Sequence, residues 1–88
     1  MIKDPYLTYV EDYEIQPGVF YTGQLKSQQR EGYGIQTWPD GARYEGLWAN
    51  NKAQGRGTFL HATGDLYEGE WHNDVANGYG LFRHKNGS

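Results

Sequence analysis

A strict internal period of 23 residues constrains this chain more than any other feature, because a repeating sequence folds into repeating structural units. Rows begun at Tyr21, Tyr44 and Tyr67 align without a gap. All 13 glycines of the 88-residue chain fall into the pattern. The glycine columns are Gly23, Gly46 and Gly69; Gly32, Gly55 and Gly78; Gly34, Gly57 and Gly80; and Gly41, Gly64 and Gly87, with Gly18 one period before Gly41.

Each row holds two short segments with the alternation typical of β-strands. In residues 43–49, Tyr44, Gly46 and Trp48 alternate with Glu45 and Leu47. In residues 56–61, Gly57 and Phe59 alternate with Arg56, Thr58 and Leu60 in the same way. A period of two with aromatic enrichment indicates strands, and no segment has a convincing helical stripe. We therefore expect about seven strands in an up-and-down antiparallel meander.

Two kinds of connection join these segments. The polar stretch from Asn50 to Gln54 predicts a hairpin loop of about five residues. The stretch from Trp38 to Gly41 predicts a turn, because proline presets φ, Asp40 can bond nearby backbone and glycine accepts positive φ. The pairs Thr63–Gly64 and Asn86–Gly87 predict the same turn, although their residues favour it less strongly than Pro39-Asp40-Gly41 does.

The N-terminal part matches the period only in its spacing. Because Gly18 lies one period before Gly41, residues 10–20 are interpreted as the second half of a degenerate repeat whose glycine pair has become Tyr9 and Glu11. At the other end, Ser88 stands where another first strand should begin. The array is expected either to cap itself there or to be part of a longer one.

The segments Tyr44–Trp48 and Tyr67–Trp71, each followed by Gly-x-Gly at fixed spacing, closely resemble the MORN repeat. The resemblance covers residues 16–88 in three rows, although the first row lacks the Glu and Trp of the motif, and residues 1–15 are expected to form a cap or degenerate half repeat. It implies an all-β fold: a single-layer antiparallel meander of about three 23-residue β-hairpin repeats plus an N-terminal half repeat. It also implies scaffold, cytoskeletal or membrane-junction roles.

The aromatic columns admit two interpretations. In a single-layer sheet the rings must supply the core, since Tyr and Trp each bury roughly 150–250 Å² while keeping a polar group for water. Glycines beside them would provide room for the rings. Alternatively, a rim of the same rings lines an exposed surface for a partner. The candidate partner-binding residues are Tyr21, Trp38, Tyr44, Trp48, Phe59, Tyr67, Trp71 and Phe82.

Catalytic and metal chemistry is poorly supported. His61 and His84 share a column with Trp38. Residues of one column in successive repeats lie two strands apart, or roughly 9.5 Å, and this separation is too large for both histidines to bind one zinc ion. Glu45 and Glu68 occupy the same position of successive repeats, so they are interpreted as repeated acids on the solvent-exposed face rather than as a catalytic pair. The Gly-x-Gly elements lack the third glycine and the helix of a phosphate-binding loop. We expect no enzyme activity, cofactor or metal.

The charge balance limits the partners. The formal net charge is −3, with both signs interspersed, so the basic stripe needed for nucleic acid is absent and anionic lipid is disfavoured. The chain has no cysteine and no apolar run near the roughly 18 residues of a membrane helix, which favours the cytoplasm. Association with the cytoskeleton or a membrane remains compatible with this composition.

Four functions follow as hypotheses. The leading one is a protein-interaction scaffold, in which a partner segment docks on the aromatic face or a second copy adds to a terminal strand. The alternatives are phospholipid binding, a regulatory segment of a larger protein such as a lipid kinase, and a choline- or glycan-binding repeat. The last would need adjacent aromatic pairs within each repeat, and these are missing.

Overall fold

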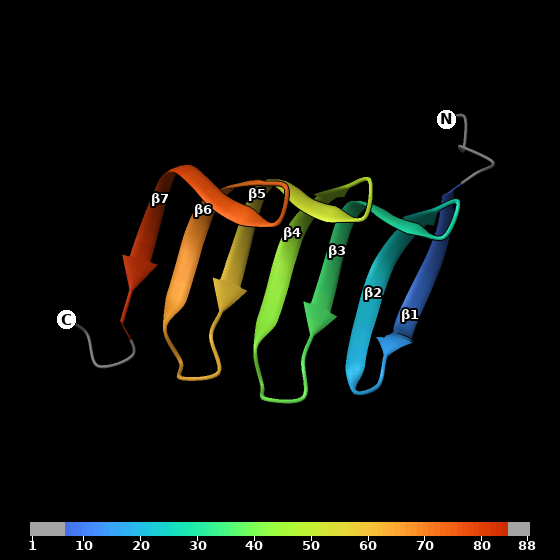
Figure 1. The fold of residues 1–88 in the computed structure, drawn as a ribbon, viewed down its shortest axis with the longest axis horizontal. Coiled ribbons are helices and arrows are strands. Elements are labelled where there is room, and N and C mark those ends of the chain that lie inside the picture. The colour runs from blue at the N-terminus through green and yellow to red at the C-terminus, as the bar shows by residue number, and fades with distance from the viewer. Residues whose placement is uncertain (1–6, 85–88) are drawn as a thin grey trace.

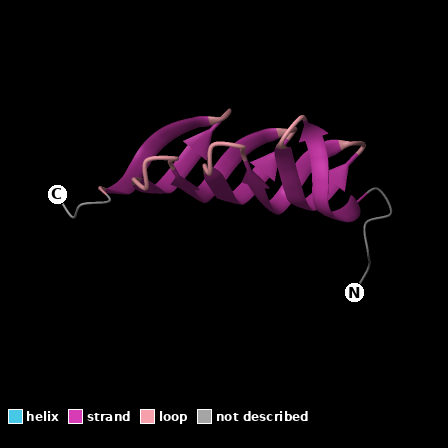
Figure 2. Cartoon of the chain, turned by 90° about the horizontal axis from the view of Figure 1, so that it is seen from below, coloured by secondary structure: helices cyan, strands magenta, loops and turns pink. Residues whose placement is uncertain are grey.

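The computed structural model describes residues 7–84 and shows one open sheet of seven strands. Neighbouring strands are antiparallel and follow the order of the chain without a crossover (Figure 1). Within the described range all regular structure is β-strand, drawn in Figure 2 as a single curved layer. The predicted all-β meander of seven strands is therefore confirmed. The strands are β1 (Leu7–Gln16), β2 (Val19–Lys26), β3 (Gln29–Thr37), β4 (Arg43–Ala49), β5 (Lys52–Leu60), β6 (Leu66–His72) and β7 (Val75–Arg83).

The three repeats are hairpins closed by two-residue turns. Both turn residues have positive φ, as in Asn50 (52°) and Asn51 (70°) between β4 and β5. Type I′ turns of this kind match the twist of paired strands, and asparagine tolerates the left-handed conformation. The five-residue loop expected over residues 50–54 was therefore wrong. Residues 52–54 belong to β5, where Ala53 pairs with Trp48.

The longer turns between repeats have the predicted chemistry. The amide of Gly41 donates to the carbonyl of Trp38 at 3.0 Å, and the carboxylate of Asp40 accepts from the amide of Ala42 at 3.0 Å. The turn before β6 is built alike, with the amide of Gly64 donating to the carbonyl of His61 at 2.8 Å. The turn expected at residues 86–87 lies outside the described residues.

A row of glycines crosses the sheet from β2 to β7. Consecutive members are direct cross-strand partners in every pair of strands that the row crosses. At β1 the row ends on Val10, which pairs with Gly23. The sequence predicted Glu11 at this place, which was wrong because Asp12 adopts positive φ in a bulge and shifts the register of β1. The members of the row are Gly23, Gly34, Gly46, Gly57, Gly69 and Gly80.

Each repeat places one tyrosine ring on the glycine of its own second strand. A Cβ built on Gly57 would lie 2.5 Å from Cζ of Tyr44, and one on Gly80 would lie 2.5 Å from Cζ of Tyr67. No real Cβ approaches another atom so closely, so the rings occupy space that only glycine leaves free. The predicted packing of rings against glycines is confirmed, and it explains why the aromatic face needs no second layer.

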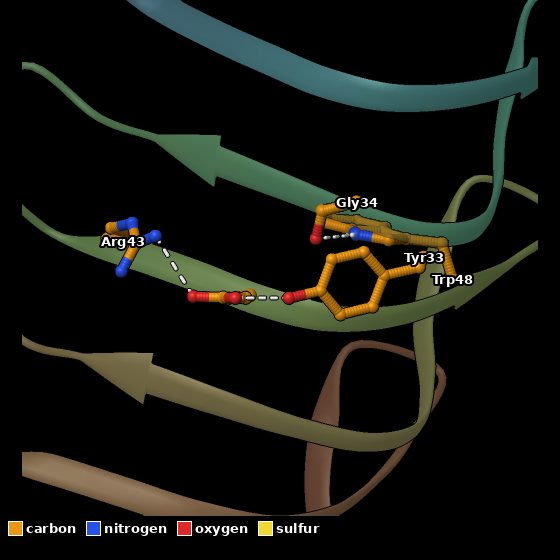
Figure 3. Close-up of polar contacts among 5 residues, drawn as sticks. Tyr33, Gly34, Arg43 and Trp48 are labelled. Carbon is orange, nitrogen blue, oxygen red and sulfur yellow. Dashed lines mark hydrogen bonds and ion pairs between the residues drawn. The ribbon is translucent and has the colours of Figure 1, made fainter. Parts of the chain in front are cut away.

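Backbone carbonyls satisfy the polar ends of these rings. The Tyr44 hydroxyl donates to the carbonyl of Leu47 at 2.9 Å, and Tyr21 bonds Gln24 in the same way at 2.7 Å. The Trp48 indole Nε1 donates to the carbonyl of Gly34 at 3.1 Å, as Figure 3 shows, and Trp71 bonds Gly57 at the same distance. The rings therefore lie on the sheet with their polar atoms paired, as buried aromatic side chains with polar groups require.

The tyrosines of the first two repeats are each covered by the tryptophan of the following repeat. Tyr21 lies edge-on to Trp48 with ring centroids 5.7 Å apart, and Tyr44 to Trp71 at 5.3 Å. Both tyrosines are buried, whereas Tyr67, beyond which no further repeat is described, is only half-buried. The core thus forms between repeats, as in other arrays whose units bury surface only against their neighbours.

The hairpin tips form a second connection between repeats. Asp74, in the turn after β6, accepts from the amide of Ala53 at 2.7 Å, while its own amide donates to the carbonyl of Ala53 at 3.0 Å. One period earlier, Asn51 makes the equivalent pair of bonds with Arg30. The tips at Asn51 and Asp74 are therefore hydrogen-bonded to the start of the second strand of the preceding repeat.

Candidate functional site

The eight predicted partner-binding side chains separate into two groups. Tyr21, Tyr44 and Trp48 have exposed fractions of 0%, 1% and 4%, so they belong to the core and offer a partner almost no surface. The other five keep exposed area, and Phe82 is 52% exposed. These accessible five are Trp38, Phe59, Tyr67, Trp71 and Phe82.

Four of the accessible rings form a continuous strip with His61 and His84, whereas Tyr67 contacts Trp71 but is not counted in the strip. Phe59 is the central member, with its ring centroid 5.7 Å from Trp38, 6.0 Å from Trp71 and 4.7 Å from His61. His61 in turn lies 6.4 Å from Phe82, which meets His84 edge-on at 4.7 Å. We call this set the aromatic strip; it comprises Trp38, Phe59, His61, Trp71, Phe82 and His84.

Sequence reasoning missed the two histidines of the strip. It considered His61 and His84 as zinc ligands and not as partner-binding residues, although they share a column with Trp38. That column was the available signal, since a position filled by Trp in one repeat and by His in the next two favours a flat ring. The structure places all three residues of this column beside a phenylalanine ring.

A groove of about 200 Å³ opens between the aromatic strip and the hairpin tips. Trp38, Phe59 and Trp71 line its strip side, and Asp74 lines its tip side. Its remaining lining includes the polar pair Arg30 and Gln36 between otherwise apolar walls. Such a mixture of rings with a few fixed polar groups is typical of recognition sites.

Arg30 is held firmly in this groove. Its guanidinium carbon lies 4.5 Å from the centroid of the Trp48 ring, an arrangement in which the ring face attracts the cation. The guanidinium donates to the side chain of Gln36 and, at 2.7 Å, to that of Asn51. Burial lowers the pKa of Arg30 from its ordinary value, and the negative charge of Asp74 opposes that shift. Arg30 is therefore a positioned cation with its hydrogen bonds largely made.

Two core tyrosines respond to burial in the same direction. Burial raises the pKa of Tyr21 to about 12, against the opposing influence of Arg30. Burial also raises the pKa of Tyr44 to about 12, and Asp74 adds to the shift. Loss of water disfavours the phenolate, so both rings stay neutral and available as donors.

The opposite face carries a wider hollow of about 430 Å³ with polar walls. Its charges are paired within the chain: Arg43 lies 2.9 Å from Glu45, whose carboxylate also accepts from the Tyr33 hydroxyl (Figure 3). That hydrogen bond raises the pKa of Tyr33. Glu45 and Glu68 line this hollow, on the face predicted for them. Apart from Tyr33, the described residues that line this hollow carry no aromatic ring, unlike those of the groove, so this face makes a weaker candidate for an apolar partner segment.

Between residues 7 and 84 no three His, Cys, Asp or Glu side chains gather closely enough to hold a metal ion. His72 contacts Gln54 at 3.0 Å, and His84 lies 3.8 Å from Asp65. No helix in the described part of the chain is long and apolar enough to span a membrane.

Comparison with known proteins agrees with the geometry. The family model of the MORN repeat matches three consecutive segments, residues 21–43, 44–66 and 67–88. No curated protein matches the chain. The matched segments start at Tyr21, Tyr44 and Tyr67, the residues that begin the three rows, and each contains one tyrosine seated on the glycine of its own second strand. Matching well over half of the chain in the same register as the hairpins, the model shows that the protein belongs to the MORN repeat family.

Proposed function

We propose that this chain is a non-catalytic protein-interaction module whose aromatic strip and adjoining groove bind an apolar or aromatic segment of a partner protein. The supporting observation is the continuity of the strip from Trp38 to His84, with Phe82 more than half exposed. Exposed apolar patches of this kind mark interaction sites, and aromatic side chains dominate the energetics of such contacts.

The groove gives the partner segment its expected chemistry. Trp38, Phe59 and Trp71 favour flat or aliphatic side chains, whereas Asp74 at the opposite wall favours a lysine, an arginine or a backbone amide. Arg30, already over Trp48 and bonded to Gln36, keeps little capacity for an added anion. We therefore expect a segment rich in aromatic and aliphatic residues that carries a positive charge.

Phospholipid binding is the alternative, and the charges disfavour it. The net charge is −3, and the cation within the groove, Arg30, is already hydrogen-bonded to the chain. A basic residue near an anionic membrane contributes only about 1 kcal/mol, so stable attachment needs several free ones.

Selection from a random peptide library displayed on phage tests the proposal. Peptides selected on the 88-residue chain should be rich in aromatic residues and carry net positive charge. Replacement of Phe59 or Trp38 with alanine should weaken the best peptides at least about tenfold, since one such anchor contributes roughly 2 kcal/mol or more. The matched control is Leu47→Ala on the opposite face, where a 43% exposed side chain is removed.

Circular dichroism first establishes that each variant is folded. Peptides that bind the Phe59 and Trp38 variants as well as the parent, and that weaken with Leu47→Ala, would contradict the proposal. Vesicles containing phosphatidylserine provide the second arm. The chain should not sediment with them, and sedimentation that high salt abolishes would favour the lipid alternative.

A further inference from the structure

Strand β7 forms one edge of the sheet described between residues 7 and 84, and it carries large exposed side chains. It pairs with β6 on one side, and each of its nine residues is exposed. Tyr79 and Leu81, on the face opposite the aromatic strip, are 92% and 69% exposed. An edge strand presents unpaired N–H and C=O groups, which are a template for a further antiparallel strand.

The internal pairings show what such a strand must carry. Where β3 meets β4, Gly34 faces Gly46, Tyr33 faces Leu47, and the bulge glycine Gly32 faces Trp48. The pairing of β5 with β6 repeats the glycine contacts, since Gly57 faces Gly69 and the bulge glycine Gly55 faces Trp71. A strand that pairs with the second strand of a repeat therefore places a glycine opposite the glycine of the row. It places an aromatic ring opposite the bulge glycine.

Strand β7 contains both halves of this pattern. Its central residues read Gly78, Tyr79, Gly80, Leu81 and Phe82. When two copies of β7 pair antiparallel about Gly80, Gly80 faces Gly80 of the second copy, Tyr79 faces Leu81, and Gly78 faces Phe82. These pairs reproduce, position for position, the glycine pair, the tyrosine–leucine pair and the glycine–ring pair of β3 with β4. We infer that the chain forms a symmetric homodimer through its β7 edges.

The symmetry of the sheet favours pairing of β7 with β7 of the second copy over pairing of β7 with β1. A two-fold axis perpendicular to the sheet makes the two β7 strands antiparallel and keeps both aromatic faces on one side. Strands β1 and β7 run in the same direction, because the seven strands alternate. A second copy that offered β1 antiparallel would turn its aromatic face to the other side, and it would bring Val10 where the row needs glycine.

The dimer has a defined shape. The glycine row would continue unbroken from one copy into the other, in one antiparallel sheet. An interface with a two-fold axis is self-complementary and closes on itself, so the assembly stops at two copies. The inference goes beyond the proposed function and does not depend on it, since the aromatic strip binds a partner segment whether the chain is single or paired.

Sedimentation velocity over a range of protein concentrations tests the dimer. The 88-residue chain should show a concentration-dependent species of twice the mass of one chain. The double variant Tyr79→Lys/Leu81→Lys places two like-charged pairs in the interface and should weaken association at least about tenfold, because like charges directly opposite on a sheet repel and the apolar contact is lost.

A charge exchange makes the test specific to this register. The variant Tyr79→Glu/Leu81→Glu should also be monomeric, and an equimolar mixture of the lysine and glutamate variants should recover the dimer. The matched control is Tyr9→Lys/Tyr13→Lys on β1, whose tyrosines are 62% and 48% exposed, and it should dimerise like the parent. Circular dichroism confirms that the variants are folded.

The opposing outcomes are equally clear. A single monomeric species at about 1 mM protein would overturn the inference. So would a dimer that survives both substitutions on β7, or one that is lost in the β1 variant. Recovery of the dimer in the mixture, without recovery in either variant alone, is the result that only this pairing predicts.

Discussion

At the scale of single residues, the fold depends on the six glycines of the row that crosses the sheet, where a Cβ would collide with a neighbouring strand or ring. Gly57 has ordinary backbone angles, so no conformational preference requires glycine there. Its lack of a Cβ is required instead by the Tyr44 ring, whose Cζ and Cε2 lie 2.5 and 2.6 Å from where a Cβ would be. The repeat therefore retains glycine for space, at the entropic disadvantage that glycine brings to a strand.

Replacing Gly57 with valine tests this space requirement. The Cβ and its two methyl groups would displace the buried Tyr44 ring and the rings packed on it, Trp48 and Trp71. The free energy of unfolding should fall by more than about 1 kcal/mol, the size typical of overpacked positions. Urea denaturation followed by tryptophan fluorescence measures it, and an unchanged midpoint would contradict the packing described for this ring.

At the scale of the strands and turns, neighbouring hairpins are joined by more than the sheet ladder. The tip residue Asp74 bonds the backbone of Ala53 through both its side chain and its amide, and Asn51 does the same at Arg30. These contacts bring each tip down over the preceding repeat. They close the tip side of the groove that the aromatic strip borders.

Replacement of Asp74 with alanine should loosen this connection without opening the hairpin. The amide of Ala53 would lose its side-chain acceptor, which costs about 1–2 kcal/mol for a charge-assisted bond at a partly buried site. Hydrogen exchange should be faster at the backbone amide of Ala53 in β5 and little changed at the amide of Gln36 in β3. A comparable change throughout the sheet would mean that the tip bond stabilises the whole fold rather than the junction.

Much of this architecture could be predicted from the sequence, because the repeat aligns residues with like surroundings. The strands, the turns containing Gly41 and Gly64 and the seating of rings on glycines all follow from alternation and spacing. The length of the hairpin turns could not be predicted from alternation. The polar stretch 50–54 resembles a loop, although residues 52–54 belong to β5 and Lys52 and Ala53 pair with β4. The register of β1 was also missed, because the bulge at Asp12 adds a residue that leaves no mark in the pattern.

The candidate site could be predicted only in part. The aromatic columns were visible, but alternation does not say which rings the next repeat will cover. Tyr44 is buried because Trp71 lies over it, whereas Tyr67 has no such cover in the described part of the chain. The roles of His61 and Arg30 were missed because each includes a contact with a ring of the next repeat, Phe82 and Trp48 respectively.

At the scale of the whole molecule, stability should depend on pH in the alkaline range. The pKa of Tyr21 and that of Tyr44 are both raised to about 12, from about 10 in the unfolded chain. The stability linked to these shifts is fully present below pH 10. It is lost as the pH rises towards 12, because the unfolded chain releases its phenolic protons first.

Denaturation curves collected from about pH 8 to 12 check this dependence. The free energy of unfolding should be nearly constant up to about pH 10 and then fall by up to about 1.4 kcal/mol per pH unit for each buried tyrosine. Spectrophotometric titration at 295 nm should show Tyr21 and Tyr44 among the late-titrating phenols, together with Tyr33, whose pKa is also raised. In the Tyr44→Phe variant one of them should be missing, and its persistence would show that the late titration belongs to another tyrosine.

The central claim is that each tyrosine fills the space that the glycine of the next strand leaves free. A double-mutant cycle at Tyr67 and Gly80 tests it most directly, because Tyr67 is half-buried and its removal leaves the interior repeats intact. Gly80→Ala should destabilise the parent by about 1 kcal/mol or more, yet be neutral or stabilising when Tyr67 is already alanine, since alanine is better than glycine in a strand. Equal effects of Gly80→Ala in both backgrounds would show that the ring and the glycine are not coupled, and would contradict the account.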